Sequence, residues 1–393
     1  MASESTSDLQ ITEKELRRWR LIEDFRLRLA QAVREHPLHR SWADPDRLLS
    51  YDDYLSLFLF GLLNPVVRTM RGLCAASGLK RVQAEVCSRR VSLGSFSEAQ
   101  RLLDPALLQP VFSQLAQQVQ AKTPGPAGRQ WHIQDSSLFN ALPRMYWALW
   151  RRQGKSQSQV RLHLSLDITN QSPARASVTT GRGCERATWR DLVQPGDGYV
   201  ADRYYSEDYQ LLGELDEAKI AFVVRLRESA AIHVEQELAL SAEDQKAKVL
   251  DDARVQLGCK TRCRAGALRL VRVQTEKEVL LLLTNLSIEE LSAAEVALLY
   301  KQRWQVELFF RWIKYIFGCR HWLAESPQGA AIEIYLALIG ALLLQLYTGE
   351  RPNRRMFELI QLYLLGVAEL EELCAGVQQE HDRLSKVKKS KKS

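Results

Sequence analysis

The sequence predicts an α/β protein in which a mixed β-sheet with flanking helices follows a helical N-terminal region and is interrupted by a β-rich insertion. Three observations lead to this prediction. Apolar residues recur every three or four positions through residues 12–122, which is the helical period. The stretch TPGPAG at 123–128 then carries two prolines and two glycines, as a linker does. Beyond it the period changes to two, and strands later alternate with helices, which favours a mixed sheet covered by helices.

Composition excludes several classes of protein. The chain has 393 residues, of which 46% are apolar and 26% are charged. This is the balance of a soluble globular protein and excludes collagen-like, mucin-like and wholly disordered chains, while the length predicts two or three domains. The net charge of +7 arises mainly at residues 383–393, which hold six lysine or arginine residues and no acid. Nucleic-acid binding must therefore be argued from local patches of charge.

Cysteine usage and apolar segments predict a cytoplasmic protein. The seven cysteines are scattered without a disulfide framework, which suits a reducing compartment. The N-terminus is polar and acidic, unlike a secretory signal. The longest apolar run, 334–347, has 14 residues, whereas a membrane span needs about 20. We therefore expect a buried core helix there and no membrane partner.

The helical region at 1–122 is a candidate DNA-binding domain. Arginine and lysine residues gather around the stretch RGLCAASGLKRVQ, where two helical segments meet at Ser77 and Gly78. This spacing is compatible with a helix-turn-helix, whose second helix enters the major groove of DNA. Many helical hairpins also turn at a glycine, so structural packing is the alternative interpretation.

After the linker, the periodicity divides the chain into a core, an insertion and a C-terminus. Strands are expected at 130–139, 145–150, 160–168, 198–202 and 220–226, and helices from about Glu185 and at 206–219. Residues 129–229 would form the first part of a catalytic core, 230–286 a β-rich insertion without aromatic residues, and 287–350 the second, helical part of the core. Residues 351–393 would form a helical C-terminus with a basic tail.

Three acidic residues stand where an active site is expected. Asp135 lies at the end of the first strand or at a bulge in it. Asp202 lies at the carboxyl end of the strand GYVAD, and Glu307 lies in the helix YKQRWQVELFFRWIK. In α/β proteins, function concentrates at the carboxyl ends of strands. Three converging carboxylates can hold two divalent cations about 3.5–4 Å apart for phosphodiester cleavage. Asp167 and Asp197 are nearby acids that could replace Asp135, although the glycines beside Asp197 favour a turn.

The helix that contains Glu307 carries a pattern of charge. Tyr300, Arg303, Glu307, Arg311 and Lys314 are spaced three, four, four and three residues apart, so one helix face should present all five. One acid among three cations suits a metal ligand beside groups that grip phosphates. The alternative is an amphipathic core helix with incidental cations.

The same residues carry a resemblance to a known family. The pattern Tyr300, Arg303, Glu307 and Lys314 resembles the Tyr-Arg-Glu-Lys signature of bacterial insertion-sequence transposases, which are DDE enzymes with a ribonuclease H-like core. The stretches IQDSS around Asp135 and ADRYY around Asp202 look like the first two catalytic blocks of that family. The resemblance covers roughly residues 60–350 and includes the layout of the insertion.

The resemblance implies a function and a set of roles. Asp135, Asp202 and Glu307 would be the catalytic acids and would bind two Mg²⁺ ions, for which Mn²⁺ could substitute. Tyr300, Arg303, Arg311 and Lys314 would contact DNA phosphates. The protein would cleave double-stranded DNA at the ends of an insertion sequence and join them to target DNA, acting as a homodimer in the DNA complex and associated with the bacterial nucleoid. The alternatives are a metal-dependent nuclease on the same core and a non-catalytic DNA-binding protein descended from a transposase.

One departure limits what the resemblance implies. Some relatives place a tryptophan in the insertion to stack on a flipped DNA base, but this insertion contains none. The insertion therefore lacks the residue that supports hairpin formation in those relatives, and whether excision passes through a hairpin stays open. Trp304 follows Arg303, and we expect it to pack in the core rather than against a base.

Overall fold

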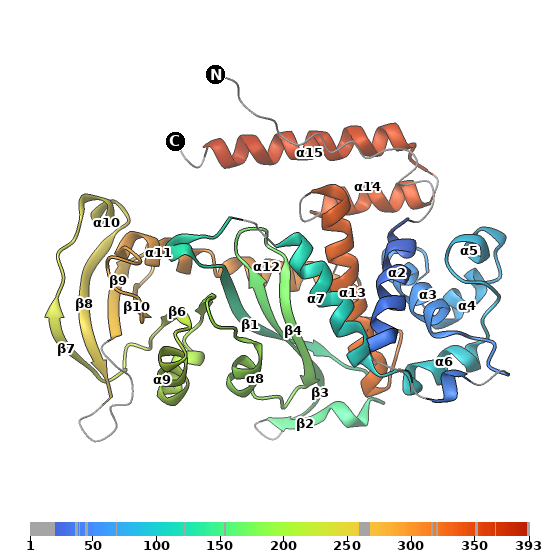
Figure 1. Ribbon diagram of the computed structural model, residues 1–393, viewed down its shortest axis with the longest axis horizontal. Coiled ribbons are helices and arrows are strands. Elements are labelled where there is room, and N and C mark those ends of the chain that lie inside the picture. Colours follow the sequence, from blue (N-terminus) through green and yellow to red (C-terminus); the bar gives the residue numbers. More distant parts are fainter. Residues whose placement is uncertain are drawn as a thin grey trace. The chain divides into compact units, whose positions relative to one another are not determined.

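The computed structural model describes residues 20–35, 38, 40–43, 46–67, 69–120, 123–152, 155–258, 268–315, 317–319, 321–349, 353–365 and 367–390 (Figure 1). The chain divides into two compact units. The first comprises Met1–Val119, Phe139–Val160 and Arg311–Ser393, and the second comprises Gln120–Leu138 and Arg161–Phe310. Residues 259–267 of the insertion and the last three residues of the basic tail lie outside the described residues.

The first unit is built from helices around one buried apolar helix. It contains α2 (Arg20–Glu35), α3 (Tyr51–Leu63), α4 (Met70–Ala76), α5 (Lys80–Glu85), α6 (Leu93–Leu102), α7 (Leu108–Val119), α13 (Pro327–Thr348), α14 (Arg354–Leu364) and α15 (Leu370–Ser390). Helix α13 packs against α3, α6 and α7. By length and composition α13 could cross a membrane, but 89% of its most apolar window is buried inside the protein, as in a core helix.

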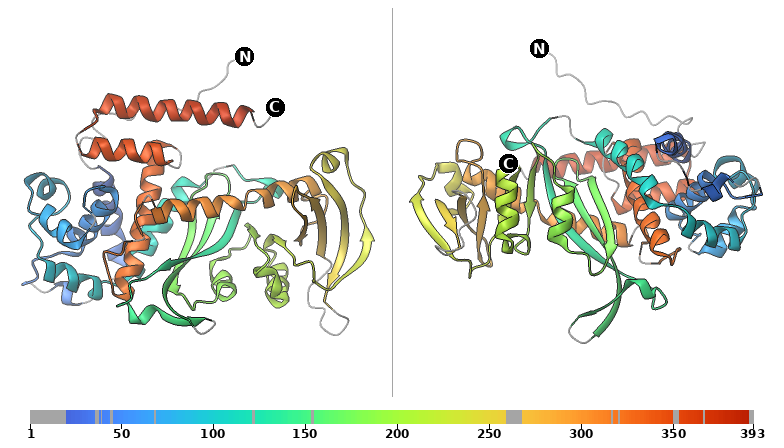
Figure 2. Two further views of the ribbon diagram at one scale, coloured as in Figure 1. Left: turned by 180° about the vertical axis from the view of Figure 1, so that it is seen from behind. Right: turned by 60° about the horizontal axis from the view of Figure 1, so that its bottom comes forward.

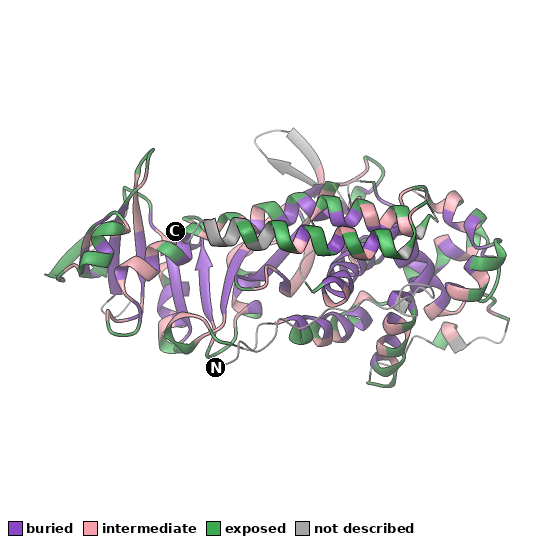
Figure 3. Ribbon diagram, turned by 90° about the horizontal axis from the view of Figure 1, so that it is seen from above, coloured by how far each residue is buried: buried purple, intermediate pink, exposed green. Residues whose placement is uncertain are grey.

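Helix α15 shows the amphipathic pattern of a helix that covers another. It packs against α14. Leu373, Val377 and Glu380 are buried at helical spacing, while the residues between them are exposed or of intermediate burial, and the helix shows this alternation in Figure 3. The buried Glu380 carboxylate accepts hydrogen bonds from Asn353 at 2.9 Å and Arg355 at 3.0 Å, which fixes α15 to the start of α14.

The second unit is organised by a mixed sheet. Its strands are β1 (Trp131–Asn140), β3 (Lys155–Asp167), β4 (Pro173–Thr180), β5 (Gly198–Ala201), β6 (Ala221–Arg225), β7 (Ile232–Glu237), β8 (Val249–Leu257), β9 (Leu268–Gln274) and β10 (Val279–Thr284). They lie in the order β3-β1-β5-β6-β10-β9-β8-β7, with β4 beside β3. Strands β1, β5 and β6 are parallel to one another. In the rest of the sheet, in the order β6-β10-β9-β8-β7, each strand is antiparallel to the next. The predicted mixed α/β class is therefore confirmed, and the strands of the insertion extend the core sheet through β10.

Helices cover both faces of this sheet. Helices α8 (Glu185–Leu192) and α9 (Tyr209–Glu217) lie on one face, and α11 (Ala293–Lys301) lies on the other (Figures 1 and 2). Trp189 of α8 and Tyr205, before α9, are fully buried in the same apolar cluster as Tyr199 and Phe222 of the central strands. This cluster fixes the α8 face of the sheet.

Three local expectations differ from the structure. Of residues 145–150, Tyr146–Ala148 form a 3₁₀ turn, and the strand β2 (Leu149–Arg152) begins only after it. The strand β1 continues to Asn140, so Asp135 is its fifth residue and does not end it. The helix expected through 300–314 is broken, because the amide of Arg303 bonds to the carbonyl of Tyr300 three residues back, as in a 3₁₀ turn. Helix α11 therefore ends at Lys301, and α12 (Trp304–Tyr315) begins after the break.

Candidate active site

The pairing of β1 with β5 brings two of the three predicted acids together. The two strands are parallel and in register from Trp131 beside Gly198 to Gln134 beside Ala201. One further step of this register places Asp135 beside Asp202, which directly follows β5. The amide of Ser136 donates to Asp135 Oδ1 at 2.7 Å, and the amide of Tyr204 donates to Asp202 Oδ1 at 2.9 Å. Each carboxylate is thus oriented by a neighbouring backbone N–H.

The surroundings of Asp135 oppose its ionisation. The pKa of Asp135 is raised to about 7, mainly by burial and in part by the negative charges of Asp202 and Glu185, while the Ser136 amide and Arg303 oppose the rise. These effects of charge show that two other acids lie close to Asp135. A nearby cation would relieve the repulsion among them, since opposite charge favours the ionised carboxylate.

Arg303 links Asp135 to the third predicted acid. Its Nη2 donates to Glu307 Oε1 at 2.7 Å, and its Nη1 lies 3.7 Å from Asp135 Oδ2. Arg303 can reach both because it occupies the break between α11 and α12, with Glu307 one turn further on. Among the described residues, no three acidic, histidine or cysteine side chains are grouped closely enough to hold a metal ion in this arrangement.

The predicted phosphate-binding residues lie in different settings. Tyr300, at the end of α11, is buried, and burial raises its pKa, with Arg303 and Arg225 lowering it and Asp202 raising it. Arg311 and Lys314 belong to the part of α12 in the first unit, where Arg311 is exposed. The Lys314 ammonium lies 4.9 Å from the centre of the Phe139 ring, and burial lowers the pKa of Lys314. The five side chains therefore do not form one continuous helix face as expected.

Trp304 is not the core residue that we expected. It is 52% exposed and lines a cavity of about 680 Å³ with Tyr300 and Arg303. Trp304 is the first residue of α12 after the helix break. Four other lining residues are lysines and one is acidic: Lys246, Lys248, Lys277, Lys301 and Glu276.

Sequence reasoning missed a polar network on the α8 face of the sheet. Arg161 of β3 pairs with Glu185 at the start of α8 and donates to Ser136 Oγ at 2.7 Å. The hydroxyl of Tyr205 donates to the other oxygen of Glu185 at 3.4 Å. The only sequence signal was the alternation along β3, which puts Arg161 on its polar face. Nothing local indicated that Glu185 would lie near Asp135.

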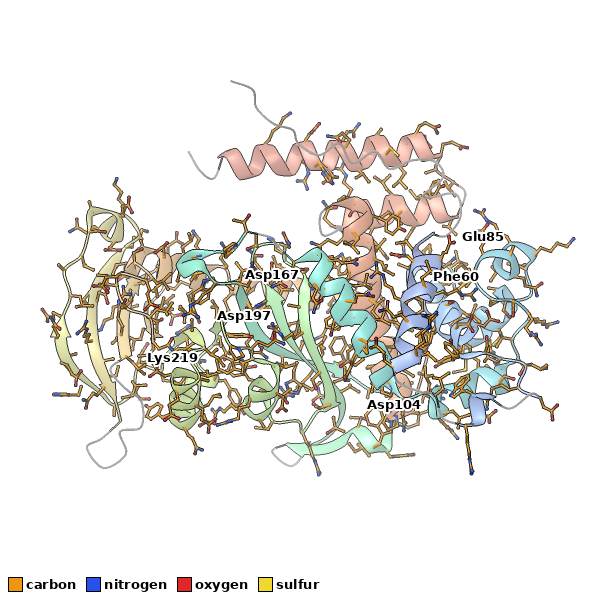
Figure 4. The ribbon with its side chains drawn as sticks, viewed as in Figure 1. Phe60, Glu85, Asp104, Asp167, Asp197 and Lys219 are labelled. Atoms are coloured by element: carbon orange, nitrogen blue, oxygen red, sulfur yellow. The ribbon has the colours of Figure 1, made fainter. Side chains whose placement is uncertain are left out.

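Asp167 and Asp197, the two alternatives to Asp135, lie near the amino ends of β1 and β5 (Figure 4). Asp197 Oδ2 accepts from Arg175 at 2.7 Å and lies 3.2 Å from His132 Nε2. Burial alone would raise the pKa of Asp197, but hydrogen bonds from His132 and Arg175 lower it. Burial raises the pKa of Asp167. These contacts make Asp197 an anchor for Arg175 at the opposite ends of the strands from Asp202.

Comparison with known proteins gives consistent matches. Residues 127–344 match the family model described as "Transposase DDE domain". Similar proteins named as transposases include y4zB of Sinorhizobium fredii, 27% identical over 209 residues that cover 52% of this chain and 57% of that protein. The transposase of element IS5377 of Geobacillus stearothermophilus is 27% identical over 51% of this chain and 52% of its own. That of element IS4SA of Synechocystis is 21% identical over 75% and 80%. The chain thus spans about half the length of the first two relatives.

Proposed function

The chain belongs to the Transposase DDE domain family, and from this premise we propose that it is a DNA transposase that cleaves at the ends of an insertion sequence and joins them to target DNA by two-metal phosphoryl transfer. The observation that carries this proposal is the convergence of Asp135 and Asp202 at adjacent parallel strands, with Arg303 linking Asp135 to Glu307. The arrangement β3-β1-β5-β6 with helices on both faces suits a ribonuclease H-like core.

The three acids have the donor chemistry that divalent metal ions prefer, although in this arrangement the described side chains are not grouped closely enough to hold an ion. Asp135, Asp202 and Glu307 offer carboxylate oxygens, the hard ligands that Mg²⁺ prefers, and Mn²⁺ accepts the same donors. The raised pKa of Asp135, caused by burial and by neighbouring negative charge, indicates a site that gains from added positive charge. These three residues would hold the ions, whose chemistry is to activate a water or hydroxyl and to stabilise the leaving oxygen.

The protein's own side chains would position the DNA for in-line displacement. In the first step the oxygen of water bonds to phosphorus, and the bond to the 3′ oxygen breaks, which frees a 3′ hydroxyl. In the second, that hydroxyl attacks a phosphorus of the target strand and displaces its 3′ oxygen. Arg303, with its planar fork, and Tyr300 would bind the phosphate next to the acids. Arg311 and Lys314 would bind other phosphates of the DNA.

A cavity beside the acids suits the backbone of DNA. Its lining includes four lysines but only one acid: Lys246, Lys248, Lys277, Lys301 and Glu276. No ion pair to these lysines occurs among the described residues. Unpaired cations near the cleavage point favour binding of polyanionic DNA by release of counterions.

The first unit presents a second cationic surface. The loop 86–91 of this unit is held by hydrogen bonds to two buried side chains. The amide of Ser88 donates to the Asp53 carboxylate at 3.0 Å, and the amide of Val91 donates to Ser77 Oγ at 2.8 Å. This loop exposes Arg89 and Arg90.

The short helices beside this loop carry further cations. Helices α4 and α5 meet at residues 77–79, as the helix-turn-helix interpretation expects, and expose Arg71, Lys80 and Arg81. We assign this surface to binding of double-stranded DNA at the element's ends. Because two ends must be held together, the active form on DNA would be a homodimer.

The test is cleavage of element-end DNA with Mg²⁺ by the full chain. Asp202→Asn should abolish nicking and leave end binding largely intact, because amide oxygen replaces the charged ligand without removing the DNA-binding surfaces. Asp191→Asn, on the exposed side of α8, is the matched control and should nick normally. Unchanged nicking by Asp202→Asn would contradict the assignment.

A strand-transfer assay with precut ends distinguishes a transposase from the two alternative functions, a nuclease and a non-catalytic DNA-binding protein. Joining of precut ends to a target plasmid supports the proposal. Cleavage without joining would indicate a nuclease on the same core. Binding that persists in EDTA, with no cleavage in Mg²⁺ or Mn²⁺, would indicate a DNA-binding protein without catalysis.

A further inference from the structure

An ion pair on the α8 face of the sheet lies behind the two converging acids. Successive residues of a strand point to opposite faces, so Ser136 faces α8 while Asp135 faces the Arg303 side. Arg161 donates to Ser136 Oγ at 2.7 Å and to the carbonyl of Gly181 at 3.3 Å, and it pairs with Glu185. The side chains of Arg161 and Glu185 are only 12% and 19% exposed. This pair is therefore largely withdrawn from water and tied to the residue next to Asp135.

The same pair reaches the turn that holds Asp202. The hydroxyl of Tyr205 donates to Glu185 Oε2 at 3.4 Å, and the amide of Tyr205 donates to the carbonyl of Asp202 at 3.3 Å. The ring of Tyr205 is fully buried, with its centre 4.9 Å from that of Trp189. Tyr205 is thus contacted by the Glu185 carboxylate at its hydroxyl and by the Trp189 ring at its own ring. A continuous path of contacts runs from Ser136 through Arg161 and Glu185 to Tyr205, joining the backbone beside each acid.

We propose that Arg161 and Glu185 are a positioning couple that sets the spacing of Asp135 and Asp202 and thereby the affinity of the site for divalent metal ions. This inference rests on the proposed function, since it takes Asp135 and Asp202 as metal ligands. Neither member of the couple needs to touch the metal. Partners that orient metal ligands from behind are worth about 10- to 100-fold in metal affinity when removed.

The direction in which removal of Arg161 changes the affinity for metal ions distinguishes a positioning role from a purely electrostatic one. If Glu185 acted only through its negative charge, removing it would weaken cation binding, and removing the positive charge of Arg161 would strengthen it. If the two act as a couple, either change frees the other side chain and loosens the acids. Both variants then bind metal more weakly, and the double variant loses little more than either one.

The experiment is a titration of the full-length protein with Mn²⁺ alone, without DNA, followed by electron paramagnetic resonance. Glu185→Gln and Arg161→Met should each raise the Kd for Mn²⁺ by about 10- to 100-fold. Nicking of element-end DNA should need a higher Mn²⁺ concentration by the same factor, with the rate at saturating Mn²⁺ largely recovered. Tyr205→Phe removes only the hydroxyl and should give a smaller rise, which keeps the test open if a charge variant fails to fold.

Asp197→Asn is the matched control. Asp197 forms an ion pair with Arg175 of similar exposure, 15% and 19%, at the other end of β5. Its loss should lower the melting temperature without changing the Kd for Mn²⁺. An unchanged Kd in Glu185→Gln and Tyr205→Phe, or tighter binding in Arg161→Met, would overturn the positioning role. If instead wild type binds no Mn²⁺, or Asp202→Asn binds it as well as wild type, the proposed function fails and not this inference alone.

Discussion

Replacing Glu333 with glutamine should make the protein increasingly more stable than wild type as the pH rises through neutrality. Glu333 lies in α13 and is fully buried. Its Oε2 accepts from the amide of Leu323 at 2.9 Å and from that of Ala324 at 3.4 Å, while its Oε1 has no hydrogen-bond partner in the described part of the chain. Burial raises the pKa of Glu333 to about 8, although the two amides lower it. The folded protein therefore keeps this carboxyl protonated near neutral pH.

The magnitude follows from proton linkage. A free glutamate has a pKa of 4.5, so the unfolded chain releases this proton well below the pH at which the folded chain does. Stability from the buried neutral carboxyl is complete below pH 4.5 and is lost as the pH rises to about 8. Within this window the free energy of unfolding of wild type falls by about 1.4 kcal/mol per pH unit relative to a residue that does not titrate. Glutamine can accept the same two amides and has no proton to lose, so the advantage of Glu333→Gln should grow by about 3 kcal/mol between about pH 5 and 7.

Urea unfolding of both proteins at several pH values, followed by circular dichroism, measures this difference. Comparing the two proteins at each pH cancels the titration of all other groups. Glu228→Gln makes the same chemical change at an exposed position and serves as the control. A difference in unfolding free energy between Glu333→Gln and wild type that stays constant across the range would refute the reasoning, because it would mean that Glu333 ionises alike in both states.

Three further substitutions test packing and charge elsewhere. Arg269→Met should lower the free energy of unfolding in urea by about 3–5 kcal/mol, because it leaves the Asp252 carboxylate without its ion-pair partner, and that carboxylate is fully buried. A decrease below about 1 kcal/mol would contradict this. Gly198→Ala should cost about 1–3 kcal/mol, because the added methyl group would lie 2.7–2.9 Å from the Trp131 ring; an unchanged melting temperature would show that the ring can move freely. Trp304→Ala should change the free energy of unfolding by less than about 0.5 kcal/mol, because the side chain is 52% exposed. A decrease as large as that for a buried tryptophan would mean that Trp304 does pack in the core.

Much of the second unit could be predicted because its signals are local. The alternation from Val160 to Leu166 predicted a strand with one apolar face, and all four apolar residues of that stretch are buried. Asp202 was expected at the end of a strand, and it directly follows β5. The roles of the acids as metal ligands stay a prediction, as do the phosphate contacts of Tyr300, Arg311 and Lys314.

The sequence by itself determined the periodicity of the strands and the resemblance to the transposase family, because each depends on residue types within a short window or a spaced motif. Only the tertiary structure decided that Arg303 lies in a break between α11 and α12, that Trp304 is exposed, and that Glu185 lies behind Asp135. The physical reason is that these features depend on residues far apart in the chain. The sheet must first bring β1, β3 and β5 together before Arg161 can meet both Ser136 and Glu185, and no local pattern records that meeting.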